Sequence, residues 1–452
     1  MTAMSTPGGA PRSVVVVGAG MVGLSTAWFL RRAGLEVTVL EQDHVAAGSS
    51  WGNAGWLTPP ITTPLPEPTI LRSGIAALVS PASPVYVPLR PDLELLRFLL
   101  GFVRHSTHTA WRRAMSAYIP LNRRALAAFD LLADGGVTEP TVRTEDFLAC
   151  YRHPGQRRGL LAELEAIRAA GQPVDADLLD GAELRALAPA LTAEVTAGIR
   201  LAGTRFIDPP RYMLALADAV LASGVVLREG TRVVAVDGGS ATRPALVRTR
   251  PTRPVGGPSE HEAPPARPAR PATARGTRAA GEEILRADAV VLATGAWLGD
   301  LARPFGVRMV VQAGRGYSFS IPVDPMPTMP LYFPVQRVAC TPLGYRYRVA
   351  GMMEFRRPGD PLDPRRIRAI VDATRPLLAG DLDDRVDEWV GSRPVTTDGL
   401  PLIGPTSAPR VIAAGGHGMW GITLGPLTGQ LVAELVTSGD VPPELWPFDP
   451  LR

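Results

Sequence analysis

The 452-residue sequence contains no lysine, so its 47 basic residues are all arginine. This absence excludes catalysis through a lysine Schiff base or a lysine general base. The two cysteines, Cys150 and Cys340, cannot form a disulfide framework in so long a chain, which favours a reducing, cytoplasmic environment. The sequence also lacks an uninterrupted apolar run long enough to span a bilayer, and we therefore expect no membrane-spanning helix.

An excess of one charge is confined to a single segment. Residues 240–280 hold eight arginines against Glu260 and Glu262, whereas the whole chain has a formal net charge of only +4. The remaining residues therefore carry a small net negative charge, and we expect no nucleic-acid partner. The same segment holds eight prolines and is predicted to be a disordered insertion. Residues 1–12 lack the apolar core of a secretory signal and are predicted to be a flexible leader.

A strand, a glycine turn, a helix and a second strand follow the leader. Residues 13–20 predict a buried strand that ends in glycines, residues 21–34 have a helical period, and residues 35–42 predict another strand. This succession within about 30 residues is typical of a doubly wound α/β sheet. Further helices are expected over 92–134, 156–188, 208–223 and 423–438, and several strands are expected within 308–356.

The turn after the first strand has the spacing of a dinucleotide-binding site. Gly18 permits a tight turn, Gly20 permits close approach of a pyrophosphate, and Gly23 permits close packing of the helix on the strand. Glu41 ends the second strand, where a carboxylate binds ribose hydroxyls and disfavours a 2′-phosphate. The predicted dinucleotide site comprises Gly18, Gly20, Met21, Val22, Gly23, Glu41 and Gln42.

Two more segments favour a bound flavin over NAD. The loop after the second strand offers small and hydroxyl-bearing residues that suit a closely wrapped cofactor: Ser49, Ser50, Asn53, Ala54 and Gly55. Near the C-terminus a glycine-rich turn leads into a helix whose N–H groups suit the negative charge of a reduced flavin: Gly418, Gly421, Ile422 and Thr423. A plain loop and a packing turn are the alternatives for these two segments.

In combination the motifs resemble those of the FAD-dependent D-amino-acid oxidase (DAO) superfamily, and within it the bacterial D-amino-acid dehydrogenases of the small-subunit type. The resemblance rests on the glycine turn, GSSWGNAGWLTP, FIDPPRYMLALA, ADAVVLATGAW, YRVAGMMEF, GSRPVTTDGLPLIG and GGHGMWGITLGPLTGQLVAEL. It implies an α/β fold of the glutathione-reductase/p-hydroxybenzoate-hydroxylase type. The implied Rossmann-like FAD-binding domain comprises 13–58, 200–300 and 390–452, and the interleaved α+β substrate domain comprises 59–199 and 301–389.

The resemblance also implies a reaction. Flavin N5 would take a hydride from the α-carbon of a D-amino acid, and the imine would hydrolyse to a 2-oxo acid and ammonia. Electrons would pass to a quinone or another carrier, because the lysine that speeds the oxygen reaction in the related sarcosine oxidases is absent. The alternatives are an oxidase of glycine, sarcosine or a cyclic imino acid such as D-hydroxyproline, and a flavoprotein module of a multi-subunit dehydrogenase. The apolar residues 92–104 suit either core packing or a peripheral contact with the inner face of the plasma membrane.

Particular residues receive roles from the same resemblance. Arg393 would hold the substrate carboxylate in a bidentate fork, with a structural or surface arginine as the alternative. His417 would be a positioning residue near the flavin or, alternatively, a structural histidine with its hydrogen bonds satisfied. Tyr345 and Tyr347, which alternation places on one face of a strand, suit either a hydroxyl contact to the carboxylate or core packing. The backbone of Val233 would pair with adenine, and Thr294 and Gly295 would pack beside the cofactor. The sequence shows no cluster with the spacing of a metal site.

Overall fold

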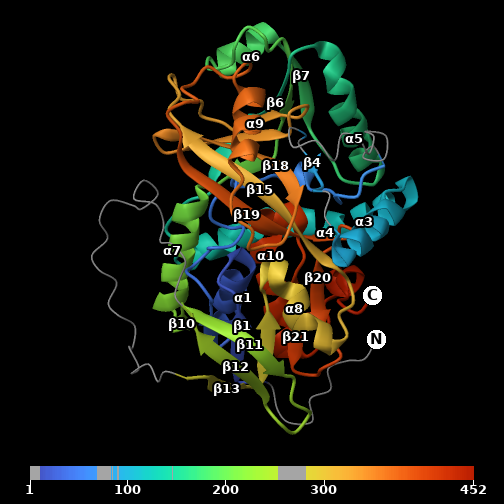
Figure 1. Cartoon of the computed structure of the whole chain (residues 1–452), viewed down its shortest axis with the longest axis vertical. Coiled ribbons are helices and arrows are strands. Elements are labelled where there is room, and N and C mark those ends of the chain that lie inside the picture. The colour runs from blue at the N-terminus through green and yellow to red at the C-terminus, as the bar shows by residue number, and fades with distance from the viewer. Residues whose placement is uncertain (1–10, 69–82, 84, 89–90, 145, 253–280) are drawn as a thin grey trace.

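The computed structural model describes residues 11–68, 83, 85–88, 91–144, 146–252 and 281–452, and it places two large β-sheets towards opposite ends of the molecule (Figure 1). The helices of these residues are α1 (Met21–Arg32), α3 (Leu93–His105), α4 (His108–Asp134), α5 (Arg158–Ala169), α6 (Gly181–Leu187), α7 (Pro209–Ala222), α8 (Leu298–Ala302), α9 (Pro364–Thr374) and α10 (Gly421–Ser438).

The first sheet has the order of a doubly wound nucleotide-binding sheet. Its strands, from edge to edge, are β10 (Val226–Arg228), β2 (Glu36–Leu40), β1 (Ser13–Val17), β14 (Ala289–Leu292), β21 (Val411–Gly415) and β20 (Leu402–Pro405). All pair in parallel except β20, which runs antiparallel to β21. Val14 and Val16 pack with residues of α1 and α10, whereas Val15 and Val17 pack on the opposite face. The alternation of these valines therefore buries both faces, and the predicted fold class is confirmed.

A small antiparallel sheet covers that opposite face, with the order β11 (Thr231–Asp237), β12 (Ala245–Pro251) and β13 (Glu283–Ala287). The prediction of disorder over 240–280 is wrong for β12, because Ala245 and Val247 are buried against the nucleotide-binding sheet. Residues 253–280 lie outside the described residues. The predicted leader likewise lies outside them, except for its last two residues.

The second large sheet has one face packed against the half of the molecule that contains the nucleotide-binding sheet. Its order is β19 (Val386–Thr396), β15 (Val311–Ile321), β18 (Arg346–Phe355), β17 (Val338–Leu343), β16 (Leu331–Phe333), β6 (Phe147–Tyr151), β8 (Ala197–Leu201) and β7 (Ala176–Asp180), with β4 (Val85–Tyr86) beside β18. One face packs on α9 and α6, and the other is continuous with the core of the nucleotide-binding half. A fourth, short sheet of the described residues is formed by β3 (Trp56–Leu57), β9 (Thr204–Phe206) and β5 (Val142–Thr144).

The helix predictions are confirmed in part. The helices at 208–223 and 423–438 are present as α7 and α10, and the side chain of Asp208 accepts the N–H of Arg211 at 3.2 Å as the predicted cap. The segment 92–134 forms two helices, because Thr107 caps a new helix at residue 108. The segment 156–188 was wrongly predicted as helical throughout, since β7 pairs with β8 between α5 and α6. The predicted domain boundary at residue 390 falls inside β19.

Candidate active site

The glycine turn after β1 packs against the end of β14. Gly18 has a φ of +105°, and a Cβ there would lie 2.5 Å from the carbonyl oxygen of Ala293. A Cβ on Gly23 would overlap the carbonyl of Gly18. The N–H of Met21, the first residue of α1, donates to Ser50 Oγ at 3.1 Å. The turn thus requires glycine at both positions and joins the predicted loop of small residues to the helix N-terminus.

The starts of α1 and α10 lie together. A Cβ on Gly425 would be 2.5 Å from Cγ of Met21, and one on Gly429 would be 2.6 Å from the carbonyl carbon of Ser25. The hydroxyl of Thr423 donates to the carbonyl of Trp56 at 3.1 Å. Two glycine-rich helix starts that are about 400 residues apart in the chain therefore meet beside one loop. The predicted positions Gly418, Gly421 and Ile422 lie at this second start.

Glu41 lies at the carboxyl end of β2, beside the glycine turn. Its carboxylate accepts the N–H groups of Ala19 at 2.8 Å and Asp43 at 3.0 Å, and burial raises its pKa. The N–H of Thr231 donates to the Glu41 carbonyl at 2.7 Å, which brings β11 with Val233 to this edge. Gln42 accepts a hydrogen bond from Arg232 at 3.0 Å. The predicted ribose and adenine contacts are thus gathered at one end of the sheet.

The remaining predicted cofactor residues flank this turn. Asn53 accepts the N–H of Gly55 at 2.9 Å, and Thr341 donates to the carbonyl of Ala54 at 2.6 Å. Ser49 and Ser50 precede them in the same loop, and Gly295, with a φ of +55°, begins a 3-10 turn after β14. The buried hydroxyl of Thr294 has no hydrogen-bond partner among the described residues. An orphaned hydroxyl beside a glycine cradle fits a bound dinucleotide, which supplies the acceptors that the protein lacks there.

Arg393 lies on the face of the second sheet that is turned towards this loop. Its guanidinium crosses the neighbouring strand above Gly316, where a Cβ would overlap it, and Nη1 donates to the carbonyl of Met352 at 2.9 Å. Burial lowers the pKa of Arg393 to about 10, so the group remains charged at neutral pH. Within the described residues no carboxylate pairs with it. A half-buried cation that lacks an anionic partner is suited to bind a ligand carboxylate.

The contact to Met352 depends on a bulge in β18. The pairing of β15 with β18 shifts register between Arg315 and Tyr317, and Met352 opposite them has a φ of +67°. This left-handed conformation, which is costly for methionine, accompanies the carbonyl contact to Arg393. The sequence showed no sign of either the bulge or the contact.

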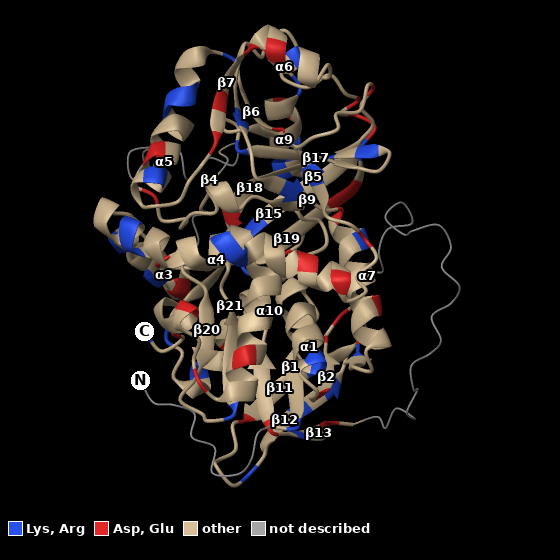
Figure 2. Cartoon of the chain, turned by 180° about the vertical axis from the view of Figure 1, so that it is seen from behind, with Lys and Arg blue, Asp and Glu red and all other residues tan. Residues whose placement is uncertain are grey.

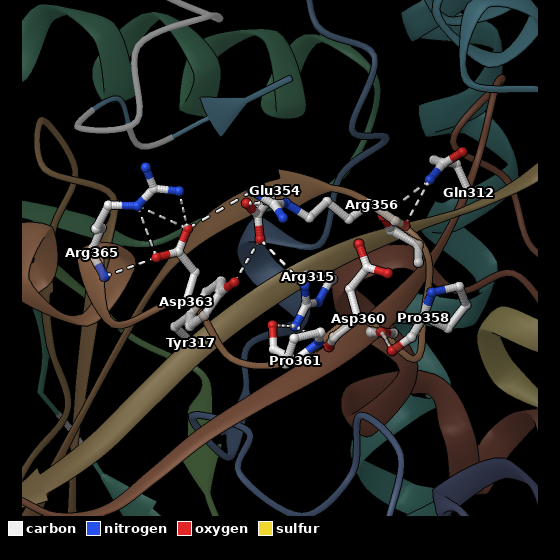
Figure 3. A network of polar contacts seen from close by, with 12 residues as sticks. Gln312, Arg315, Tyr317, Glu354, Arg356, Pro358, Asp360, Pro361, Asp363 and Arg365 are labelled. Atoms are coloured by element: carbon white, nitrogen blue, oxygen red, sulfur yellow. Dashed lines mark hydrogen bonds and ion pairs between the residues drawn. The ribbon is translucent and has the colours of Figure 1, made fainter. Parts of the chain in front are cut away.

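A polar network around the carboxylate of Glu354 (Figure 3) lies beside the bulge, and its Tyr317 packs with residues of α9. The carboxylate of Glu354 lies 2.6 Å from Nε of Arg356 and 3.6 Å from Nη1 of Arg315, and it accepts the hydroxyl of Tyr317 at 2.5 Å. Glu354 and Arg315 are fully buried. The network therefore ties the two strands together one residue beyond the bulge.

Trp389 is a further residue of this face that the sequence did not identify. Trp389, Gly391 and Arg393 alternate on β19, and a Cβ on Gly391 or Gly52 would overlap the indole ring. Ser318 of the next strand donates to the carbonyl of Gly52 at 2.8 Å. The loop of residues 49–55, called the cofactor loop from here on, therefore lies on the sheet face that carries Arg393.

Of the two alternatives for the tyrosines, core packing is confirmed for Tyr347, and a contact of its hydroxyl with the substrate carboxylate is contradicted. Tyr345 precedes β18 and is 70% exposed. Tyr347 is fully buried among residues of the α9 side, and its hydroxyl donates to the carbonyl of Met329 at 3.1 Å. Tyr347 therefore lies on the face of the sheet that α9 covers, opposite to the face of Arg393.

His417 is buried at the start of the turn before α10. Its Nε2 lies 2.9 Å from the hydroxyl of Thr428, and burial lowers its pKa to about 4. The imidazole is therefore neutral at physiological pH, which suits positioning of the α10 start better than proton transfer. In the described part of the chain, no group of His, Cys, Asp and Glu could hold a metal ion.

The doubly wound sheet, its glycine turn and the adjacent acid define a dinucleotide-binding protein. The family model for FAD dependent oxidoreductases (DAO) matches residues 13–435, and the chain belongs to that family. FAD is accordingly its cofactor, and the protein is an oxidoreductase.

Similar proteins agree with this assignment. The chain is 31% identical over 436 residues to a D-amino acid dehydrogenase of Rhizorhabdus wittichii, covering 94% of this chain and 95% of the relative. It is 30% identical to a D-amino acid dehydrogenase of Cereibacter sphaeroides, covering 94% and 91%. The structure of glycine oxidase from Geobacillus kaustophilus is similar with a TM-score of 0.68 at 21% identity, covering 98% and 99%. That of L-proline dehydrogenase from P. horikoshii is similar with a TM-score of 0.65 at 18% identity, covering 98% of each chain.

Proposed function

We propose that the protein catalyses the FAD-dependent oxidative deamination of a D-amino acid to the 2-oxo acid and ammonia. The observation that carries the proposal is Arg393, a charged guanidinium without a carboxylate partner in the described residues, on the sheet face that meets the cofactor loop. The names of the curated relatives support a D-amino acid as substrate.

Each residue of the site has its own role in the proposed reaction. Arg393 binds and orients the substrate carboxylate through a planar fork, and Gly316 leaves space for that guanidinium. When bound, FAD supplies the hydride acceptor at N5. Trp389 excludes water from one side of the site, because its indole fills the space above Gly391 and Gly52. Neutral His417 anchors the start of α10 through Thr428.

A reductive test follows directly. The purified protein should be yellow, and under anaerobic conditions its flavin absorbance should bleach with some D-amino acid but not with the L-enantiomer. Bleaching by L-forms alone would contradict the proposal. An oxidase of glycine, sarcosine or a cyclic imino acid is the second candidate, because glycine oxidase and L-proline dehydrogenase share the fold. Rapid peroxide release in air with those substrates would select it.

We also infer that electrons leave to a quinone or another carrier and that the protein contacts the inner face of the plasma membrane peripherally. No helix of the described residues is long and apolar enough to cross a bilayer. Helix α3 buries Leu95, Phe98 and Phe102. It also carries charged residues (Figure 2) and exposes four apolar side chains: Leu93, Leu96, Leu100 and Val103. Co-sedimentation with anionic vesicles should be lost in Leu96→Glu/Leu100→Glu, and unchanged binding would exclude this contact.

A further inference from the structure

The pairing of β15 with β18 is interrupted at the place where the guanidinium of Arg393 lies. Arg315 of β15 pairs with Glu354, and Tyr317 pairs with Gly351. The single residue of β15 between these pairs therefore faces two residues of β18, which defines a β-bulge. The guanidinium lies over that single residue. The bulge and the proposed substrate-binding group thus occupy the same point of the sheet.

The two residues of the bulge are buried in separate cores. Met352 packs with residues of α9, whereas Met353 packs with residues of α3. Met352 has a φ of +67°, and its carbonyl accepts Nη1 of Arg393 at 2.9 Å. The N–H donors of a guanidinium lie in one plane, so a donor held at one edge limits the directions of the others. The bulge therefore orients the fork that would bind a carboxylate.

The carboxylate of Glu354 holds the two residues of β15 that flank the bulge. Its Oε2 accepts the hydroxyl of Tyr317 at 2.5 Å and lies 3.6 Å from Nη1 of Arg315. Its Oε1 lies 2.6 Å from Nε of Arg356. Figure 3 shows these side chains converging on the carboxylate. One oxygen atom thus bridges the interval in which the pairing of the main chains is interrupted.

This network is buried and is anchored to a further segment of the chain. Glu354 and Arg315 are fully buried, and burial raises the pKa of Tyr317, so its hydroxyl keeps the proton that it donates. Nη2 of Arg315 donates to the carbonyls of Asp360 at 2.7 Å and Pro361 at 2.9 Å, in the segment that leads to α9. Hydrogen bonds are stronger in a buried site than in water, which suits a rigid support for the bulge.

The network and the guanidinium lie on opposite faces of the sheet. Arg315 and Tyr317 alternate with Gly316 on β15, and the guanidinium of Arg393 covers the Gly316 side. Within the described part of the chain, burial is the cause of the lowered pKa of Arg393, and the charge of Glu354 does not contribute to it. Any effect of Glu354 on Arg393 must therefore pass through the main chain of the bulge.

We propose that Glu354 is a positioning residue for the substrate-binding guanidinium. Through Tyr317 and Arg315 it fixes the bulge in β18. The bulge in turn presents the carbonyl of Met352 to Arg393. This inference rests on the proposed function, in which Arg393 binds the α-carboxylate of the substrate. A loosened bulge would leave the charge in place but would let the fork rotate, so the substrate would bind less tightly.

Tyr317→Phe tests the proposal, because it removes one hydroxyl from the network and leaves the ion pairs of Glu354 in place. We expect the concentration of D-amino acid that half-saturates anaerobic flavin reduction to rise about fivefold, whereas the limiting rate should change less than about twofold. Tyr347→Phe is the matched control, since that tyrosine is equally buried on the α9 side but donates to the carbonyl of Met329. The control should keep the wild-type half-saturation. Flavin content and melting temperature of both variants report any general loss of structure.

A double-mutant cycle shows whether the effect passes through Arg393. Arg393→Lys replaces the planar fork with a point charge, whose donors rotate and need no orientation by a carbonyl. Adding Tyr317→Phe to Arg393→Lys should therefore change the half-saturating concentration by less than about twofold. Equal factors in the wild-type and Arg393→Lys backgrounds would mean that the network acts on another part of the site.

The outcomes separate this inference from the proposed function. If no D-amino acid reduces the flavin of the wild-type protein, the proposed function is wrong and this inference falls with it. If D-amino acids reduce the flavin, but Tyr317→Phe changes half-saturation no more than Tyr347→Phe does, Glu354 does not position Arg393. Loss of FAD, or a decrease in the limiting rate alone, would also exclude the positioning role, because that role predicts weaker substrate binding.

Discussion

The guanidinium of Arg393 lies over Gly316, so closely that no side chain can stand between them. Gly316 pairs with Gly391 across β15 and β19, and Arg393 is two residues further along β19 on the same face. The orientation of the Arg393 guanidinium is therefore set by the lack of a side chain at Gly316 and by the hydrogen bond to the carbonyl of Met352.

Replacing Gly316 should displace the cation without removing it. In Gly316→Ala the new Cβ would overlap the guanidinium, and we expect a rise in KM of about tenfold or more with FAD retained. Gly359→Ala is the control, because a Cβ at Gly359 meets no atom of the described part of the chain within 4 Å. Equal kinetics of the two variants would show that Arg393 does not bind substrate.

Replacing the cation itself tests the carboxylate fork. In Arg393→Lys a point charge replaces a planar bidentate donor. The decrease in kcat/KM should correspond to a loss of about 2–4 kcal/mol of transition-state stabilisation, mostly through a higher KM. Steady-state kinetics with the best D-amino acid, together with the flavin absorbance of the purified variant, measures this. An unchanged KM would remove Arg393 from the site.

Cofactor retention should depend on Gly18 for a reason beyond backbone conformation. Gly18 and Gly34 both have a positive φ, but only a Cβ at Gly18 meets another atom, the Ala293 carbonyl at 2.5 Å. We expect Gly18→Ala to be purified without FAD and Gly34→Ala to retain it. The ratio of flavin to protein absorbance provides the measurement, and loss of FAD from both variants would point to strain alone.

The buried His417 should make the free energy of unfolding depend on pH. Burial lowers its pKa from 6.5 to about 4, so the unfolded chain binds a proton between these values and the folded chain does not. Stability should therefore decrease as the pH falls from 6.5 to 4, by up to about 3 kcal/mol from this residue. His417→Gln should flatten this part of the curve in urea unfolding, whereas His153→Gln, at an exposed position, should leave it unchanged. A steep slope that persists in His417→Gln would mean that other groups cause it.

Local sequence was sufficient for the nucleotide-binding half of the site. The strand, the turn with Gly18, α1, β2 and Glu41 are contiguous, and each is specified by residues within one or two turns of it. The family resemblance proposed roles for Arg393 and the start of α10, but it did not predict which residues surround them. Alternation left both a carboxylate contact and core packing open for Tyr347, because it could not tell which face of the sheet α9 would cover.

The sequence by itself determined the cofactor class, because binding a dinucleotide needs a short, continuous run of backbone and one acid. Only the tertiary structure decided what surrounds the reacting centre. The bulge at Met352 and the glycine beside the guanidinium of Arg393 arise from strands that are far apart in the chain. Pairing register and helix packing bring these groups together, and neither leaves a periodic signature in any one segment.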